Sequence, residues 1–211
     1  MTRASKRSAG LAAVIGALGV TAFVAAKAAP PKSQSSQASP SEITLKIDTA
    51  KSKVHYRVDS TLHTVHGTFT LKDGSTLYFD PSTGKAGGEV AVYAASGDSG
   101  NSSRDKRMHK EILETDKYPE LVFRPRQIEG TVMPSGTSEV KLSGVMLIHG
   151  GEREIVAQVH AELAGDQWKG TAKIEVPYIQ WGIKDPSNWL LKVKPVVNVE
   201  IEMMGAENQV K

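Results

Sequence analysis

The sequence predicts a mainly β domain whose antiparallel strands either close into a barrel or stack as two sheets. Beyond residue 42 most segments alternate apolar and polar residues with a period of two, which is the pattern of half-buried strands. Short, polar, glycine-bearing segments separate these runs, as hairpin connections do. Helical spacing occurs near residues 103–114. We therefore expect about eight to ten strands and one short helix.

Residues 1–28 have the pattern of a secretory signal peptide. Three basic residues precede an apolar run at 11–26, which ends on Ala26-Lys27-Ala28, a sequence that fits a cleavage site. We therefore expect a periplasmic or secreted protein. Because the apolar run approaches the roughly 20 residues that span a bilayer, an uncleaved inner-membrane anchor is the alternative.

The rest of the chain is expected to form a linker, one domain and a tail. Residues 29–41 are rich in Pro, Ser, Gln and Ala, and cannot bury enough apolar area to order themselves. Residues 42–206 form a single domain that is long enough for a sizeable core. Residues 207–211 are expected to be a C-terminal tail.

Charge and cysteine content exclude several classes of function. The chain has 26 Lys and Arg and 23 Asp and Glu, but residues 1–28 hold four of the basic side chains and none of the acidic ones. Removal of that segment leaves 22 basic and 23 acidic residues, so the rest of the chain is near neutral. It has no basic cluster of the kind that binds nucleic acid. The absence of cysteine excludes disulfides, thiolate zinc sites and thiol catalysis.

The first strands are predicted from alternating rows before residue 95. Their apolar positions are Val54, Tyr56 and Val58, then Gly67, Phe69 and Leu71, then Val90, Val92 and Ala94. Turns are expected at 72–75 and 80–84, where Asp, Gly, Pro and Ser gather.

The C-terminal half alternates more regularly. Its apolar rows are Val140, Leu142, Gly144, Met146 and Ile148; Ile155, Ala157, Val159, Ala161 and Leu163; Trp168, Gly170, Ala172, Ile174 and Val176; Val197, Val199, Ile201 and Met203. Turns at 149–152 and 164–166 make consecutive strands antiparallel neighbours. Closure into a barrel would also remove the exposed sheet edges.

The helix is expected over 103–114, capped by Ser102 or Ser103 and ended before Pro119. Its narrow apolar stripe consists of Met108, Ile112 and Leu113. Such a stripe fits a helix that lies over one open end of a barrel.

Residues 43–203 resemble the YceI-like family of periplasmic lipid-binding β-barrels. The segments that carry the resemblance are Val65-His66-Gly67-Thr68-Phe69, Phe79-Asp80-Pro81, Gly97-Asp98-Ser99-Gly100, the stretch from Arg104-Asp105 to Phe123, and Trp181-Gly182-Ile183. The resemblance implies an extended antiparallel lipocalin-like barrel with a helix over one end. It also implies a lumen that holds a polyisoprenoid, an isoprenoid quinone or a fatty-acid derivative. Trp181 replaces the usual Phe and no basic residue directly precedes it, which favours a different head group.

The alternating rows by themselves leave the state of the lumen open. An eight-stranded barrel has room for its own side chains or for one ligand. The inward rows mix large residues such as Phe69, Phe123 and Trp168 with small ones such as Gly144 and Ala161. These rows could interdigitate completely or leave a cavity, and the family resemblance favours the cavity.

The predicted site consists of lumen contacts and lid residues. The lumen contacts are Tyr56, Val58, Phe69, Leu71, Val90, Val92, Phe123, Leu142, Met146, Ala157, Val159, Ala172, Ile174 and Trp181. The lid residues are Arg104, Met108, Ile112 and Leu113. No cofactor is expected beyond a bound long-chain lipid.

The polar motifs do not predict catalysis or a metal site. Arg104 and Asp105 form either a helix start with a surface ion pair or a contact for a ligand head group. Three histidines, His55, His63 and His66, lie close together in the sequence. No carboxylate follows them at the spacing of a metal ligand. The Asp98-Ser99 segment does not match the G-x-S-x-G elbow, which leaves a hydrolase at the barrel mouth as the least favoured reading.

The sequence therefore favours an exported, non-enzymatic binding protein that serves in transport, storage or stress response. A packed structural or stress module without ligand is the alternative. The expected partners are an apolar lipid and, transiently, a membrane or a membrane redox protein. Nucleic acid is not among them. The chain is expected to be a monomer or a homodimer.

Overall fold

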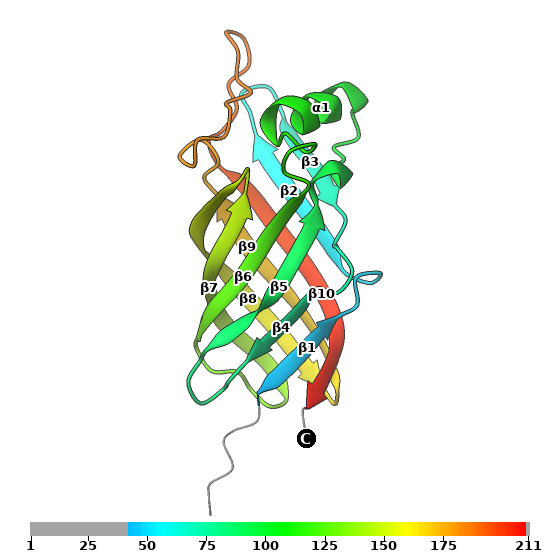
Figure 1. Ribbon diagram of the computed structural model, residues 1–211, viewed down its shortest axis with the longest axis vertical. Helices are drawn as coiled ribbons and strands as arrows, with labels where there is room; N and C mark the ends of the chain where they lie inside the picture. Colours follow the sequence, from blue (N-terminus) through cyan, green and yellow to red (C-terminus); the bar gives the residue numbers. More distant parts are fainter. Residues whose placement is uncertain (1–41, 210–211) are drawn as a thin grey trace, which may run out of the picture. The chain divides into compact units, whose positions relative to one another are not determined.

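The computed structural model describes residues 42–209, which form ten strands and one helical segment (Figure 1). The strands are β1 (Ile43–Ile47), β2 (Lys53–Asp59), β3 (Thr64–Phe69), β4 (Thr76–Phe79), β5 (Ala86–Tyr93), β6 (Glu120–Glu129), β7 (Gly136–Ile148), β8 (Gly151–Ala164), β9 (Gln167–Val176) and β10 (Val197–Gln209). The predicted signal peptide and linker lie outside the described residues. Within the described range, no helix has the length and apolarity needed to cross a bilayer.

Eight strands close into an antiparallel barrel. Their order is β1-β4-β5-β6-β7-β8-β9-β10, and β10 returns to pair with β1. The prediction of a mainly β, lipocalin-like antiparallel barrel with one short helical segment is therefore confirmed. Closure satisfies the strand edges that two stacked sheets would have left open.

The β2–β3 hairpin forms the wall that β1 and β4 are too short to provide. The last five residues of β10, Gly205–Gln209, pair with β1, whereas residues 198–202 pair with β2. Beyond β3 the chain bridges to β5 through Leu71 and Val92. The barrel thus has two halves along its axis, one closed by β1 and β4 and the other by β2 and β3.

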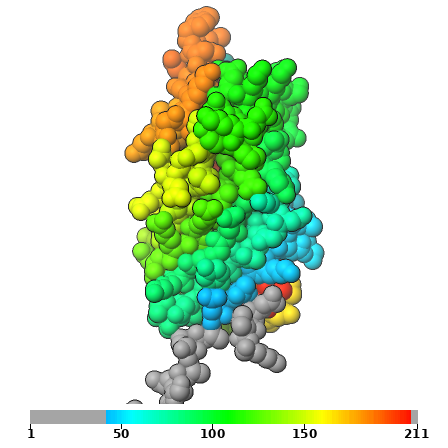
Figure 2. All heavy atoms as spheres, viewed as in Figure 1, coloured from blue at the N-terminus to red at the C-terminus, as the bar shows by residue number. Residues whose placement is uncertain are grey.

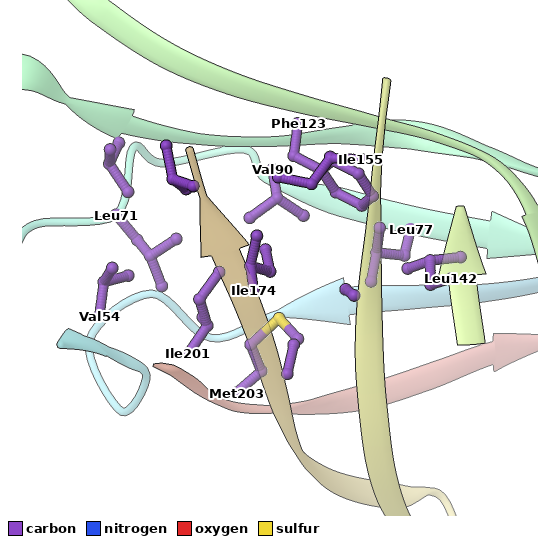
Figure 3. Packing of buried hydrophobic residues seen from close by; sticks show 14 of the residues in the cluster. Val54, Leu71, Leu77, Val90, Phe123, Leu142, Ile155, Ile174, Ile201 and Met203 are labelled. Atoms are coloured by element: carbon purple, nitrogen blue, oxygen red, sulfur yellow. The ribbon is translucent and has the colours of Figure 1, made fainter. Parts of the chain in front are cut away.

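The predicted alternation matches the burial of the strands. In β9 the even-numbered residues from Trp168 to Val176 are buried and most odd-numbered ones are exposed. The inward residues of the barrel form one continuous apolar cluster. Figure 3 shows side chains from strands far apart in sequence, such as Leu77, Leu142 and Met203, pointing into this shared interior.

Several aromatic rings lie over a glycine on the neighbouring strand. Tyr56 of β2 is the register partner of Gly67 in β3, and a Cβ at Gly67 would collide with the Tyr56 ring. Trp168 of β9 faces Gly205 of β10 in the same way. Because glycine has no side chain, each ring can lie flat against the barrel wall.

The helical segment differs in detail from its prediction. Helix α1 (Ser102–Arg107) continues directly into a π-helical turn, η2 (Met108–Ile112), after a short 3₁₀ turn, η1 (Ala94–Ser96), upstream. The cap is Asn101 and not a serine, since its side chain accepts a hydrogen bond of 3.0 Å from the Arg104 amide. An Asn side chain caps as well as Ser does, and its position one residue earlier moves the helix start.

Strand ends also moved relative to the sequence pattern. Strand β10 extends to Gln209, so the segment expected as a tail begins within a strand that β1 holds by backbone pairing. Strand β3 ends at Phe69, and Leu71 makes an isolated bridge to Val92. Alternation cannot show where a backbone partner starts or stops.

Replacement of Gly205 by Ala should destabilise the barrel. The new Cβ would lie 2.7 Å from Trp168 Nε1 and would also press on the Lys46 carbonyl oxygen, so we expect a loss of about 1–3 kcal/mol. Urea denaturation measures this loss as a lower midpoint at an unchanged slope. Gly170→Ala is the control, because its Cβ would come no nearer than 3.3 Å to the atoms around it. Equal losses in the two variants would contradict the steric argument.

Candidate functional site

A cavity of about 490 Å³ occupies the half of the barrel closed by β2 and β3. Strands β2, β3, β5, β6, β7, β9 and β10 contribute to its wall, together with α1, η2 and the connection between β9 and β10. No residue of β1, β4 or β8 lines it. The volume falls within the range of roughly 300–1,000 Å³ typical of small-molecule sites.

Valine is the commonest residue in the cavity wall. Ten of the lining residues are valines, namely Val54, Val58, Val65, Val90, Val92, Val122, Val176, Val193, Val197 and Val199. Valine reaches less far toward the barrel axis than leucine, methionine or tryptophan. The Tyr56 ring, which lies over Gly67, packs at 5.3 Å from the Phe69 ring. The wall is therefore almost wholly apolar.

The other half of the lumen is filled by its own side chains. Several core residues that do not line the cavity have long side chains. The full set of these core residues is Ile47, Leu71, Leu77, Leu142, Ile155, Ala157, Trp168, Ala172 and Met203. The small residues expected to leave space for a ligand do not all do so. A Cβ placed on Gly170 would lie 3.7 Å from the Trp168 ring, so this ring occupies the space beside the glycine. Ala157 and Ala172 are buried in this packed half. Both sequence-based readings of the lumen thus hold, each for one half.

The structure brings twelve predicted site residues to the cavity wall. They are Tyr56, Val58, Phe69, Val90, Val92, Phe123, Met146 and Ile174 from the strands, and Arg104, Met108, Ile112 and Leu113 from the helical segment. Their contact with a ligand stays a prediction.

Six predicted residues lie outside the cavity wall. Leu142, Ala157 and Ala172 belong to the packed half, and Val159 packs against the same cluster. Leu71 is buried beside β5. Trp181 packs at the edge of the core, where its carbonyl oxygen accepts a hydrogen bond of 3.1 Å from Arg153. Alternation identified their inward face but not their height along the barrel axis.

The cavity mouth carries the polar part of the lining. Five polar or charged side chains line the cavity, namely Ser60, His63, Asn101, Arg104 and Arg107, and all come from the segments at this end. The Arg104 Nε donates to the Ser99 hydroxyl at 2.7 Å, and a terminal nitrogen donates to the Ser99 carbonyl oxygen at 2.8 Å. The Ser99 hydroxyl in turn donates to Asp105. This network fixes the guanidinium at the mouth.

The helical segment covers part of this opening with its apolar side chains. Met108, Ile112 and Leu113 line the cavity, and the Tyr56 hydroxyl lies 3.7 Å from the Met108 sulfur. The outer side of the segment is held by Lys184, whose Nζ lies 2.8 Å from a Glu111 oxygen. Figure 1 shows α1 lying across the end of the barrel above β2 and β3.

Two tyrosine hydroxyls lie in this apolar environment. Burial raises the pKa of Tyr178 to about 12, with a smaller contribution from Asp185. Burial also raises the pKa of Tyr56, and the nearby Asp105 carboxylate adds to the effect. The Tyr178 hydroxyl is buried and has no hydrogen-bond partner among the described residues. Tyr178 lines the cavity, but its hydroxyl itself has almost no accessible surface.

The remaining polar candidates of the sequence analysis are the three histidines and the Asp98-Ser99 segment. Among residues 42–209 no group of three or more His, Asp or Glu side chains could hold a metal ion. His55 and His66 are exposed on the outer faces of β2 and β3, and His63 is at the mouth. The Ser99 hydroxyl is bonded to Arg104 and Asp105 and to no histidine in the described part of the chain.

Residues from the β9–β10 connection were missed by the sequence argument. Tyr178, Ile183, Pro186, Leu191 and Val193 all line the cavity. This connection, residues 177–196, contains no strand and shows little alternation, so periodicity gave no signal for it. The short run Leu191-Lys192-Val193-Lys194 does alternate, and Ile183 belongs to the Trp181-Gly182-Ile183 segment of the family resemblance, so these two signals could have pointed to the connection.

Comparison with known proteins identifies the family. A YceI-like domain model matches residues 45–204. A polyisoprenoid-binding domain from Saccharophagus degradans, implicated in plant cell wall breakdown, is 15% identical over 78% of this chain and 98% of that chain, with a TM-score of 0.60. Burkholderia cenocepacia BcnA is 16% identical over 76% of this chain and 100% of that chain, with a TM-score of 0.61. A search of curated proteins finds no match.

These two structural likenesses, at low identity, show a shared fold. The domain match covers well over half of the sequence and coincides with the barrel, from β1 to β10. This chain therefore belongs to the YceI-like family.

Proposed function

We propose that this protein is an exported, non-enzymatic carrier that holds one long-chain apolar ligand in the open half of its barrel. The observation that carries the proposal is the cavity of about 490 Å³, apolar along its wall and polar only near its mouth. A ligand with an apolar chain and one polar end matches this distribution. A polyisoprenoid, an isoprenoid quinone and a fatty-acid derivative all have that form.

The energetics are adequate for retention. Apolar burial contributes roughly 25 cal/mol per Å², so a chain that buries several hundred Å² gains about 10 kcal/mol before the costs of ordering. The polyisoprenoid-binding domain of Saccharophagus degradans, which shares the fold, supports the choice of ligand class.

The polar end of the ligand is proposed to lie at the mouth. Arg104, which Ser99 and Asp105 hold in place, can meet an anionic or carbonyl head group. The Tyr178 hydroxyl, which like any tyrosine is protonated at physiological pH and has no partner among the described residues, is proposed as a second donor that a small side-chain movement would turn toward the ligand. Export to the periplasm, and roles in transport, storage or stress, follow from the N-terminal sequence pattern and the ligand class, and belong to the same proposal.

Organic extraction of the purified protein, followed by mass spectrometry, tests the proposal directly. A stoichiometric long-chain lipid is the expected result. Two matched variants then locate it. Val199→Phe narrows the cavity, and should lower lipid binding by at least about tenfold while it leaves the stability of the delipidated protein within about 0.5 kcal/mol.

Ala157→Phe is the counterpart in the packed half. Ala157 is 1% exposed and does not line the cavity, so the larger side chain should cost about 1–3 kcal/mol of stability. Calorimetry of both delipidated variants compares the two positions. A protein that never carries lipid, or a Val199→Phe variant that binds lipid normally, would refute the carrier.

Tyr178→Phe separates stability from ligand recognition. Removal of a buried hydroxyl without a partner should raise the stability of the delipidated protein by about 1 kcal/mol, and should weaken binding of a ligand with an acceptor at its polar end. The folded-state pKa of about 12 lies above the ordinary value near 10. Wild-type stability should therefore fall as the pH rises from 10 toward 12, and the variant should lose less.

Alkaline denaturation and absorbance titration measure these two effects. Tyr78→Phe is the control, because Tyr78 is an exposed residue of β4 that does not line the cavity. If Tyr178→Phe destabilised the delipidated protein, the hydroxyl would already have a partner and could not be reserved for a ligand.

The helical segment is expected to slow ligand release. Met108→Ser together with Ile112→Ser removes apolar lining on the cavity side and should raise the ligand off-rate, with the strand circular-dichroism signal unchanged. Lys106→Ser with Lys110→Ser, on the exposed side of the same segment, should leave the off-rate unaltered. Equal off-rates in both double variants would show that the segment is not a lid.

A further inference from the structure

Three large apolar side chains are exposed together at the cavity end of the barrel. Trp189 is 89% exposed, Leu62 65% and Leu190 61%. We call these three residues the apolar tip. Leu62 belongs to the β2–β3 turn, and the other two belong to the β9–β10 connection. Figures 1 and 2 show that connection, in orange, projecting beyond the end of the barrel.

Hydrogen bonds hold the backbone of the apolar tip in place. The Thr61 amide donates to the Lys192 carbonyl oxygen at 2.9 Å, and a β-bridge joins Ser60 to Val193. The Asn188 side chain accepts hydrogen bonds from the amides of Leu190 and Leu191, at 2.9 and 2.7 Å. Because the turn is fixed in this way, Trp189 is held outward in water, which is unfavourable for so large an apolar surface.

The residues beside the apolar tip line the cavity mouth. Leu191 and Val193 point into the cavity, whereas Lys192 and Lys194 between and after them are exposed. Ser60 and His63, on either side of Leu62, also line the cavity. A surface that covered the tip would therefore lie directly against the opening.

Charge is distributed unevenly between the connections at the mouth and the rest of the described domain. The connections at the mouth, residues 60–63, 94–119, 149–150 and 177–196, carry eight Lys or Arg and six Asp or Glu. The remaining described residues carry twelve Lys or Arg and 17 Asp or Glu. The mouth connections thus have a small net positive charge, whereas the rest of the described domain is net negative. Such a distribution orients the mouth toward an anionic surface.

We propose that the apolar tip docks on an anionic lipid bilayer, with Trp189 in the interfacial region and Lys192 and Lys194 near the head groups. Tryptophan is enriched at membrane interfaces, because its ring is apolar and its N–H is polar. Basic residues beside it are attracted to anionic lipids. The contact brings the cavity mouth against the membrane, so an apolar ligand can move between bilayer and lumen without crossing water. This extends the proposed carrier function but does not depend on the identity of the ligand.

Quenching of Trp189 fluorescence by brominated lipid tests the docking in the full chain. Trp168 is buried and Trp181 is half-buried, so Trp189 is the tryptophan best placed to meet the lipid. Vesicles of equal parts brominated phosphatidylcholine and phosphatidylglycerol should quench the wild type. Trp189→Phe should remove most of that quenching. Leu62→Ser with Leu190→Ser should reduce it several-fold while Trp189 remains.

The charge contribution is tested separately. Lys192→Gln with Lys194→Gln should weaken quenching by the anionic vesicles, and added salt should act in the same direction. Met133→Ser is the matched control, since Met133 is an exposed apolar residue at the opposite end of the barrel and should have no effect.

Two results would overturn the proposal. Equal quenching of the wild type and Trp189→Phe would show that the tip does not enter the bilayer, even if another part of the chain binds the vesicles. Self-association that Trp189→Ser abolishes would show that a second copy covers the tip. Failure of the carrier proposal is distinguishable, because a protein without extractable lipid can still show Trp189 quenching.

Discussion

Backbone pairing along β10 is the constraint on which the rest of this structure depends. This strand of 13 residues pairs with β9 along one edge, and with both β1 and β2 along the other. A single strand therefore closes the barrel twice, once in each half. Because β1 and β4 end below the level of β2, the half closed by the β2–β3 hairpin can have a different interior from the half beneath it.

The two interiors differ in whether their side chains leave a cavity. Leucine, methionine and tryptophan fill the half around Trp168, and facing glycines such as Gly205 give that indole its room. Valine is the commonest residue in the wall of the other half, and Tyr56 lies over Gly67 instead of across the lumen. Stability and ligand space are thus assigned to separate parts of one barrel. A packed floor can hold the fold while the cavity above it is empty or occupied.

Polar chemistry is concentrated where the cavity opens. The Arg104–Ser99–Asp105 network, the Tyr178 hydroxyl and the lysines near Trp189 all belong to the connections at this end. The same arrangement that would orient a ligand's polar end inside the mouth would also present the mouth to a membrane outside it.

The sequence by itself determined the strands of the C-terminal half, the antiparallel order, the helical segment and the inward face of most site residues. Two-residue periodicity and hairpin turns are properties of neighbouring residues, so they can be read without knowledge of the tertiary arrangement. Only the tertiary structure decided which inward residues lie at the cavity, since Ala157 and Ile174 look equivalent in sequence but lie at different heights in the barrel. It also brought in Tyr178 and Leu191, from a connection without periodicity, and placed Leu62 beside the β9–β10 turn through bonds between Thr61 and Lys192. Height along the axis and contacts between connections depend on strand register and closure, and these are set by pairings across the whole chain.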